Sequence, residues 1–381
     1  MTHPAHPSTV SPTPPRVRFQ PDPGFHADLK RRVEAHFAAC GRAPTGGPAM
    51  VFKTAVILAW FGGSYAALLA WGGASPGLAA ALTLSVALAT AGIGFSVMHD
   101  GNHGAYARSS RVSRAFGFAL DLVGASSYLW RFKHNVQHHT YANVDGMDAD
   151  VDASPFLRLA PSQPLRRHHR AQHLYAWPMY GVLAVKWWFV DDLADLLRGR
   201  IGRLPFPRPR GGELLALVAG KAVFLGWAVV VPALVFRSAW VAAFFLLGAS
   251  ALGAVLATVF QLAHAVPEAA FHAVTAGERR LPTGWAEHQV RATVDFARGN
   301  RVLGWYVGGL NFQVEHHLFP QVCHLHYPAL APIVEAACAD HGVPYRAHAT
   351  LRAALAAHHR FLRALGRAAP AAAMKGVCAA G

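Results

Sequence analysis

The pattern of apolar residues along the chain predicts four long helices that follow one another as two close pairs. Residues 52–73 and 77–98 form the first pair, joined by a short link of Gly, Ala, Ser and Pro, and residues 214–236 and 239–263 form the second. Each run has about the 20 residues that a helix needs to cross roughly 30 Å of hydrocarbon. Because each run is apolar on every face, a membrane-spanning helix is favoured over a helix of a soluble core. We therefore expect four membrane crossings, arranged as two helical hairpins.

The segments around these runs are polar. Residues 1–48 are rich in Pro, His and charge, which predicts an N-terminal arm that is disordered at its start. Within this arm, apolar residues recur at every fourth position and predict a short helix over 25–39. Two shorter apolar patches, 116–130 and 175–190, contain or adjoin charged residues. These patches predict interfacial or half-buried helices.

Composition supports a membrane protein. The chain has 381 residues, of which 53% are hydrophobic and 14% charged, whereas charged residues make up roughly 25% of an average soluble domain. The formal net charge is +15, which is compatible with binding to nucleic acid or to anionic lipid. The sequence contains no nucleic-acid-binding motif, so no nucleic-acid partner is expected.

The positions of the basic residues predict the orientation. Of the 35 Lys and Arg residues, six lie in residues 1–50, fifteen in 99–212 and eleven in 264–381, whereas the turns within the two pairs contain only Arg237. Because cytoplasmic segments carry the excess of basic residues, the long polar segments are predicted to be cytoplasmic. Two lysines lie inside the runs near their ends, Lys53 and Lys221, and are expected to reach the membrane surface.

The chain thus divides into three parts. Residues 49–345 form the predicted membrane domain, with residues 99–212 and 264–345 on the cytoplasmic side. Residues 346–381 predict a basic amphipathic helix over 351–365 and a disordered tail.

Candidate chemistry is concentrated in histidine. Residues 134–139 read His-Asn-Val-Gln-His-His, and a helix would place His134 and His138 on one face. His99 and His103, directly after the second apolar run, are also four residues apart. The four cysteines are scattered without a Cys-x-x-Cys pair, which argues against a thiolate metal site. The cluster at 134–139 indicates a metal site, but taken alone it is also compatible with a zinc site, a pH sensor or a crowded surface.

Two further histidine groups are predicted to reach the same membrane face. His316 and His317 follow Gln313 in the sequence Gln-Val-Glu-His-His, and two predicted crossings separate them from residues 134–139. His264 lies at the end of the fourth apolar run. An even number of crossings returns the chain to the same side. The topology therefore brings eight histidines from four segments together.

These motifs resemble the three histidine boxes of the membrane-bound fatty-acid desaturases, which have the forms His-x3–4-His, His-x2–3-His-His and His/Gln-x2-His-His. All three occur in order, and the resemblance covers roughly residues 50–345. The sequence from His134 to Asp150 and the Gln313 form of the last box are similar to bacterial acyl-lipid and acyl-CoA desaturases akin to linoleoyl-CoA and front-end enzymes. The fold expected is an all-α integral membrane protein with a cytoplasmic helical cap that holds a histidine-ligated di-iron site.

The resemblance implies that two irons activate dioxygen and remove two hydrogens from an acyl chain. The ligands that it implies are His99, His103, His134, His138, His139, His264, His316 and His317. Imidazole suits iron, and eight neutral histidines supply about four ligands per ion with positions left for dioxygen. Soluble di-iron bundles instead use Glu and Glu-x-x-His ligands, and the sequence shows no inward-facing set of these.

Several polar residues near the boxes are expected to act on the ligands without binding the metal. Gln313 replaces a histidine of other branches and would hold water or orient a neighbour. Gln261 is the nearest polar substitute for an Asn that some relatives carry at the position of Phe260. Asp100 and Glu315 would accept hydrogen bonds from ligand N–H groups and so fix their tautomers. Three loop carboxylates would either do the same or lie in solvent: Asp145, Asp148 and Asp150.

The resemblance also implies partners. Many front-end relatives carry a fused haem domain marked by His-Pro-Gly-Gly, and neither the motif nor room for the domain is found in residues 1–50 or after residue 345. A separate ferredoxin- or cytochrome-type electron donor is therefore expected, and the basic cytoplasmic surface would attract an acidic one. The expected substrate is an acyl-lipid or acyl-CoA, with the apolar hairpins supplying a dry tunnel. The expected location is a bacterial inner membrane with the active site on the cytoplasmic side.

Two other functions are compatible with parts of this pattern. A di-iron hydroxylase of a lipid or terpenoid shares the boxes, because hydrogen abstraction from carbon is common to both reactions. The Asn-Val-Gln and Asn-Val-Asp-Gly sequences favour the desaturase. A zinc membrane hydrolase needs only about three protein ligands, and a metal transporter would place its ligands at the middle of the bilayer, so both fit less well.

Overall fold

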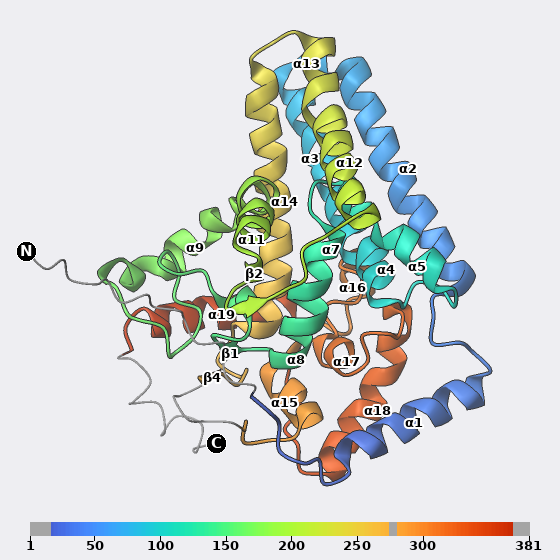
Figure 1. The fold of residues 1–381 in the computed structure, drawn as a ribbon, viewed down its shortest axis with the longest axis vertical. Coiled ribbons are helices and arrows are strands. Elements are labelled where there is room, and N and C mark those ends of the chain that lie inside the picture. The colour runs from blue at the N-terminus through green and yellow to red at the C-terminus, as the bar shows by residue number, and fades with distance from the viewer. Residues whose placement is uncertain (1–16, 274–279, 369–381) are drawn as a thin grey trace, which may run out of the picture.

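The structure, a computed structural model that describes residues 17–273 and 280–368, has two parts of different shape. Four long helical stretches stand side by side, and a broader lobe of short helices and loops lies at one end of them (Figure 1). The predicted disorder at the start of the N-terminal arm and at the end of the tail falls on residues 1–16 and 369–381, which lie outside the described residues.

The long helices coincide with the predicted apolar runs. Within the described residues, four helical stretches are long and apolar enough to cross a membrane: Gly47–Ala74, Pro76–His103, Gly212–Phe236 and Trp240–His264. Each begins and ends within five residues of its predicted bounds. The prediction of a mostly helical chain with four such helices is therefore confirmed.

Three of these stretches consist of more than one helical segment. The first is α2 (Gly47–Trp71) followed by a 3₁₀ turn (Gly72–Ala74). The second is α3 (Pro76–Gly92), a π-helical turn (Ile93–Met98) and α4 (His99–His103), and the third is α12 (Gly212–Leu225), a π-helical turn (Gly226–Val230) and α13 (Val231–Phe236). The fourth stretch is the single helix α14 (Trp240–His264). α3 is the most enclosed of the four because it packs against both α2 and α14. Small residues such as Ala87 and Ala91 line its buried side and allow this close approach.

Of the two lysines inside the long helices, Lys53 does not extend to the surface of the protein, so the expectation was wrong for this residue. Lys53 is only 1% exposed, and its Nζ lies 2.7 Å from His324 Nε2. Lys221 points toward the lobe side of α12, where its Nζ lies 2.8 Å from a carboxylate oxygen of Asp192. Distance from a helix end was the basis of the expectation. The direction of the side chain depends on which helix face meets the lobe, and both lysines lie on that face.

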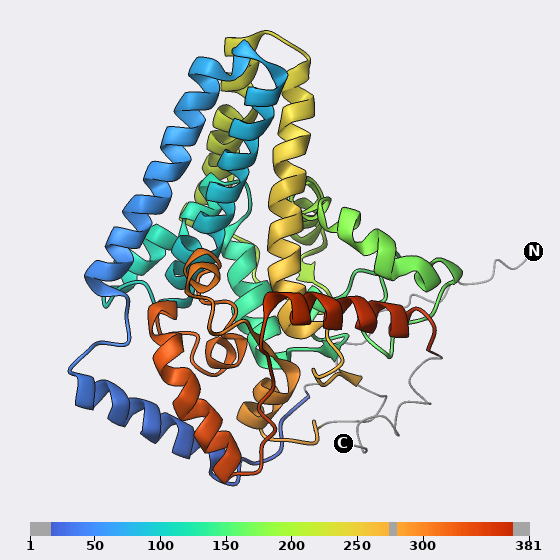
Figure 2. The same cartoon turned by 180° about the vertical axis from the view of Figure 1, so that it is seen from behind.

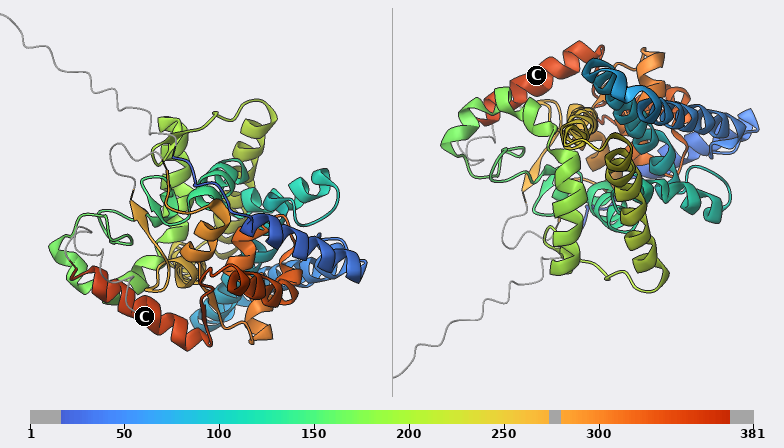
Figure 3. Two further views of the ribbon diagram at one scale, coloured as in Figure 1. Left: turned by 90° about the horizontal axis from the view of Figure 1, so that it is seen from below. Right: turned by 90° about the horizontal axis from the view of Figure 1, so that it is seen from above.

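The lobe is formed by helices from both ends of the chain. α1 (Phe25–Cys40) packs its apolar side against α18 (Tyr327–Asp340), at the end farthest from the long helices (Figures 1 and 2). The predicted helix over 25–39 is therefore confirmed. α19 (Leu351–Leu365) is the predicted C-terminal amphipathic helix. It lies along α9 (Gln172–Tyr180) on one flank of the molecule and contacts α14 (Figure 3).

Short elements complete the lobe. The remaining α-helices are α5 (Ser110–Gly117), α6 (Ala119–Leu122), α7 (Ser127–Trp130), α8 (His139–Tyr141), α10 (Leu183–Lys186), α11 (Asp192–Arg198), α15 (Trp285–Ala292), α16 (Arg301–Tyr306) and α17 (Gln313–Leu318). Further π-helical turns cover Arg131–His138 and Trp187–Asp191, and 3₁₀ turns cover Ala149–Val151, Arg167–Ala171 and His324–His326. The apolar patches at 116–130 and 175–190 thus form short helices, as predicted.

The described part of the chain contains three two-residue strand pairs, of which the two parallel pairs join segments that are distant in the sequence. The pairs are β1 (Val144–Asp145) with β4 (His272–Ala273), parallel, β2 (Arg200–Ile201) with β3 (Leu204–Pro205), antiparallel, and β5 (Asp295–Phe296) with β6 (Ala347–His348), parallel. The first pair ties the loop after residues 134–139 to the segment that follows α14. The third ties the loop before α16 to the segment that precedes α19.

Gly253 on α14 tests how closely this helix must approach the lobe. A Cβ atom at this position would lie 2.8 Å from the carbonyl oxygen of Tyr180 and 3.0 Å from the amide nitrogen of Ala184. Because these neighbours are backbone atoms, Gly253→Ala is expected to destabilise the protein by about 1–3 kcal/mol through overpacking. The measurement is the thermal unfolding midpoint of the detergent-purified protein.

Gly63→Ala on α2 is the matched control. A Cβ atom there has no neighbour within 4 Å, and alanine favours a helix over glycine by about 1 kcal/mol. The midpoint of this variant should therefore be unchanged or higher. Equal midpoints for Gly253→Ala and the unaltered protein would show that α14 does not need this close contact.

Candidate metal centre

The first two candidate ligands lie where α3 extends beyond its apolar part. The π-helical turn Ile93–Met98 connects α3 to α4, and α4 carries His99 and His103 four residues apart on one side. Both rings face the lobe, with their centroids 4.7 Å apart. Both side chains are buried. This is the helical continuation that the sequence predicted.

The second group lies on a π-helical turn and not on the ordinary α-helix that was expected. The turn covers Arg131–His138, and the amide of His139 donates to the carbonyl of His134, five residues earlier. A π-helical turn is wider than an α-helical turn, so residues four and five apart come to the same side. His139 therefore joins His134 and His138 in facing the centre, with its Nε2 3.1 Å from His134 Nε2.

The other three histidines come from two helix ends. His264 is the last residue of α14, and His316 and His317 lie on α17, directly below the long helices. All three side chains are at most 1% exposed. The structure thus brings together all eight predicted histidines, which lie up to 218 positions apart in the sequence.

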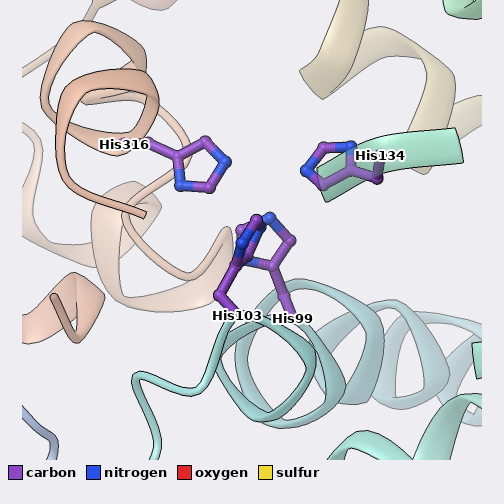
Figure 4. A group of neighbouring side chains, drawn as sticks. All are labelled: His99, His103, His134 and His316. Carbon is purple, nitrogen blue, oxygen red and sulfur yellow. The ribbon is translucent and has the colours of Figure 1, made fainter. Parts of the chain in front are cut away.

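The eight histidines form two neighbouring sets. The first histidine set contains His99, His103, His134 and His316, whose side chains point toward a shared centre (Figure 4). The second histidine set contains His138, His264 and His317. His139 lies between them: its ring centroid is 4.6 Å from that of His316 and 4.4 Å from that of His317. The arrangement offers ligands for two ions side by side.

Most of these histidines have a buried ring nitrogen without a hydrogen-bond partner among the described residues. Seven of the eight histidines have one buried nitrogen without a hydrogen bond: Nε2 of His99, His103, His138, His316 and His317, and Nδ1 of His139 and His264. Leaving a buried polar atom unpaired costs about 1–3 kcal/mol. A cluster of such atoms is a candidate site for bound metal ions. The donor set therefore fits metal ions, and it is all nitrogen, which suits iron, copper or zinc more than magnesium or calcium.

The protonation of the cluster is also suited to metal binding. Burial and the neighbouring imidazoles hold the pKa of His134, His139, His316 and His317 well below the usual value. These rings are therefore neutral at pH 7 and can bind an ion through a lone pair. Burial acts in the same direction on His138, but the Asp148 carboxylate outweighs it and raises the pKa of His138.

Several ligands are oriented from behind by hydrogen bonds. His138 Nδ1 donates to Asp148 at 3.0 Å, and His317 Nδ1 donates to the side-chain oxygen of Gln289 at 2.8 Å. His316 Nδ1 lies 3.2 Å from the Tyr327 hydroxyl. Such contacts fix which nitrogen faces the metal and hold the ring plane.

Four polar residues were predicted from the sequence to act on the ligands without binding the metal, and they lie in different places. The Gln313 amide lies 3.0 Å from His264 Nε2, so Gln313 contacts a candidate ligand. Asp100 lies 3.9 Å from His99 Nδ1 and accepts from His324 Nδ1 at 2.8 Å. Glu315 instead faces Tyr345, whose hydroxyl donates to it at 2.9 Å, and Asp295. Gln261 is buried on α14, three residues before His264.

The three loop carboxylates also differ. Asp148 contacts His138, as described above, and it also accepts from the amides of Asn143 and Asp150. Asp150 forms an ion pair with Lys133 at 2.8 Å and lies 4.0 Å from both His134 and His138. Asp145 accepts from the Ser162 hydroxyl and is not among these contacts. Of the three, Asp148 is the one that orients a candidate ligand directly.

Sequence reasoning missed α15, which holds the backbone at residues 139–142 in place, directly after the π-helical turn Arg131–His138. Trp285 Nε1 donates to the carbonyl of His139 at 3.2 Å, His288 Nε2 donates to Ala142 at 2.9 Å, and Gln289 Nε2 donates to Thr140 at 3.2 Å. Gln289 thus holds both this segment and His317. No motif in the sequence singles out residues 285–292. Tyr327 was missed for the same reason.

Comparison with known proteins agrees with the resemblance seen in the sequence. The family model described as fatty acid desaturase matches residues 74–349. An sn-1 linoleoyl-lipid 6-desaturase from Arthrospira platensis is 36% identical over 92% of this chain and 95% of its own length. The enzyme of the same name from a Synechocystis species is 36% identical over 93% of this chain and 99% of its length. An acyl-lipid (8-3)-desaturase from Physcomitrium patens is 37% identical over 90% and 72%, respectively.

Asp148→Asn tests whether the hydrogen bond behind His138 supports metal binding. The substitution keeps the shape of the side chain but removes the charge that draws the His138 Nδ1 proton. Metal affinity is expected to fall about 10–100-fold, seen as faster loss of bound metal during dialysis against a chelator.

Asp145→Asn is the control, because this neighbouring carboxylate bonds Ser162 and not a histidine. It should retain metal as the unaltered protein does. Equal retention by both variants would contradict a role for Asp148.

Proposed function

Because this chain belongs to the fatty acid desaturase family, we propose that it introduces a double bond into the acyl chain of a membrane lipid at two irons bound by the eight histidines. The observation that carries the proposal is the group of seven buried ring nitrogens without a hydrogen-bond partner, on histidines that form two adjacent sets. Enzymes of this family are oxidoreductases, and imidazole donors suit iron.

The two ions have different proposed ligands. The first histidine set would hold one iron, the second histidine set the other, and His139 would bind at the position between them. With dioxygen, two electrons and two protons, the bound irons supply the oxidising power that removes two hydrogens from the chain and forms two waters. The residues of the chain keep the site dry. The Trp130 ring stacks on His134 at 4.3 Å between centroids, and the Phe260 ring stacks on His264 at 4.7 Å.

The membrane arrangement that we propose has two hairpins with the lobe in the cytoplasm. The lobe carries most of the Lys and Arg residues, whereas the turns at the other end of the long helices contain only Arg237. This difference supports the proposed orientation, because cytoplasmic segments carry the excess of basic residues. His103 and His264 both end long helices at the lobe, which agrees with an even number of crossings. In a bacterial cell the site would then lie on the cytoplasmic side of the inner membrane.

The substrate that we propose is an acyl chain attached to a lipid. The named relatives act on linoleoyl-lipid or acyl-lipid, and a cavity of about 400 Å³ between the long helices has a mostly apolar lining. Its lining on α3 extends from Pro76 to Thr90, which corresponds to about 21 Å of helix at 1.5 Å per residue. We propose that the methyl end of the chain enters this cavity while the carbon to be oxidised stays near the histidines.

The electrons would come from a separate protein of the ferredoxin or cytochrome type. An acidic carrier would be attracted to the basic surface, because the chain carries a formal charge of +15.

Metal analysis and acyl-chain analysis test the function together. The purified protein should contain about two irons per chain, and expression in a host without polyunsaturated lipids should yield acyl chains lighter by two hydrogens. His316→Ala should abolish this product because His316 belongs to the first histidine set and lies beside His139. The variant should still insert in the membrane, which is checked by fractionation.

Other outcomes would point elsewhere. Acyl chains heavier by one oxygen would indicate the hydroxylase instead. One zinc per chain, or full activity of the His316→Ala variant, would overturn the di-iron desaturase.

Ala249→Phe tests the role of the cavity. Ala249 is buried on α14 and lines the cavity, so a phenyl ring would occupy part of its volume. Product from long acyl chains should fall at least tenfold relative to product from shorter ones, measured by mass analysis of lipids. The iron content should not change.

Ala243→Phe places the same side chain on an exposed face of the same helix and should have no effect on chain length. An unchanged chain-length profile in the Ala249→Phe variant would place the acyl chain elsewhere.

A further inference from the structure

The buried lysine on the first long helix is the feature from which this inference begins. Lys53 lies within α2, yet its Nζ is enclosed between His324 Nε2, at 2.7 Å, and the ring of Trp305, 5.2 Å from the centroid. A lysine inside a membrane-spanning helix is costly, and such residues pair with specific partners and mark functional sites. Lys53 therefore needs a reason to be retained at this position.

His324 connects this lysine to a carboxylate. Its Nδ1 lies 2.8 Å from Asp100 Oδ2, and its backbone amide lies 3.3 Å from the same oxygen. Lys53 can only donate, so His324 Nε2 accepts, and the proton of the neutral ring is then on Nδ1, where it donates to Asp100. The hydrogen-bond roles of the three side chains are mutually consistent.

Asp100 in turn faces the candidate metal centre. Its other oxygen, Oδ1, is 3.9 Å from His99 Nδ1, and His99 Nε2 is one of the buried nitrogens without a partner. At this distance Asp100 acts on the ring through its charge and not through a hydrogen bond. The charge favours the tautomer with the proton on Nδ1, which leaves Nε2 free to bind the metal. Asp100 is itself 1% exposed, so its position is determined by its protein partners and not by water.

We propose that Lys53, His324 and Asp100 form a positioning relay that orients His99 and thereby sets how tightly the first histidine set holds its metal. The relay links three separate segments: α2, α4 and the turn His324–His326 after the last histidine box. It explains why a cation is buried inside α2, because Lys53 balances the Asp100 carboxylate and holds His324 against it. The inference rests on the proposed function, since it assigns a role at the same metal centre.

The same residues could be considered as a third metal site. Side-chain atoms of Asp100, Cys323 and His324 lie within 4.8 Å of one another. The Lys53 ammonium, however, is 2.7 Å from the histidine nitrogen that would bind the ion. A positive side chain at this place opposes a second cation, so the relay is favoured and a third metal becomes an outcome of the test.

The test compares metal retention in two lysine variants of the full-length protein loaded with iron. Lys53→Met keeps an unbranched side chain of similar length and removes the ammonium group. Metal affinity of the first histidine set should fall about 10–100-fold, so that dialysis against a chelator leaves about one iron per chain where the unaltered protein keeps about two. The Mössbauer spectrum should then lose the signal of one of the two iron environments.

Lys221→Met is the matched control. Lys221 is also a lysine within a long helix, and it donates to the carbonyl of Trp188 and to Asp192, both at 2.8 Å, without contact to the histidine sets. If the loss of any lysine from a long helix only destabilised the fold, this variant would also show a lower thermal unfolding midpoint. Both irons and their spectrum should be retained.

Asp100→Asn keeps the inference testable if Lys53→Met does not fold. It preserves the size of the side chain and removes its charge, and it should cause the same spectral change and the same loss of one iron. If either variant that folds keeps two irons and the unaltered spectrum, the relay is wrong. A third metal per chain that is lost in the Asp100→Asn variant would also overturn it.

Failure of the proposed function would look different. In that case the unaltered protein would itself lack iron or make no desaturated product.

Discussion

The structure depends on burying unpaired imidazole nitrogens in one place. Seven ring nitrogens of the clustered histidines are buried and have no hydrogen-bond partner in the described part of the chain. Each would cost about 1–3 kcal/mol if it stayed unpaired, so the cluster opposes folding unless ions bind it. The helices of the lobe therefore do two things at once. They exclude water from the nitrogens, and they hold the nitrogens close enough together for shared ions to replace that water.

The local backbone is adapted to this task at two π-helical turns. One precedes His99, and the other covers Arg131–His138. An α-helix can direct residues four apart to one side, but the wider turn also brings in the residue five apart. His138 and His139 are adjacent in sequence, yet both face the cluster: His138 belongs to the second histidine set, and His139 lies between the two sets. Hydrogen bonds from α15 to the carbonyls that follow help to stabilise this less favourable backbone.

The sequence predicted the features that depend on local pattern. The four long helices and the helices over 25–39 and 351–365 follow from hydrophobic periodicity, and the histidine groups follow from spacing. The contacts behind the ligands were less accessible. Asp148 could be proposed because it is close in sequence to His138. Gln289 is 28 positions from His317 and carries no motif. Lys53 was interpreted wrongly because its expected place was inferred from its distance to the helix end, whereas its partner depends on which face of that helix meets the lobe.

The metal centre and the long helices share one framework. α3 continues into His99 and His103, α14 ends at His264, and Lys53 of α2 contacts the residues behind His99. The distance between the histidines and the cavity is therefore determined by helix length. Thr90, the cavity residue on α3 nearest to His99, precedes it by nine positions, or about 13 Å of helix. With the methyl end of an acyl chain in this cavity, the carbon that reaches the histidines depends on how deeply the chain can enter. On the proposed function, the long helices therefore determine the position of the double bond, because they contain the cavity. The lobe supplies most of the histidines that would bind the irons, so oxidation depends on it.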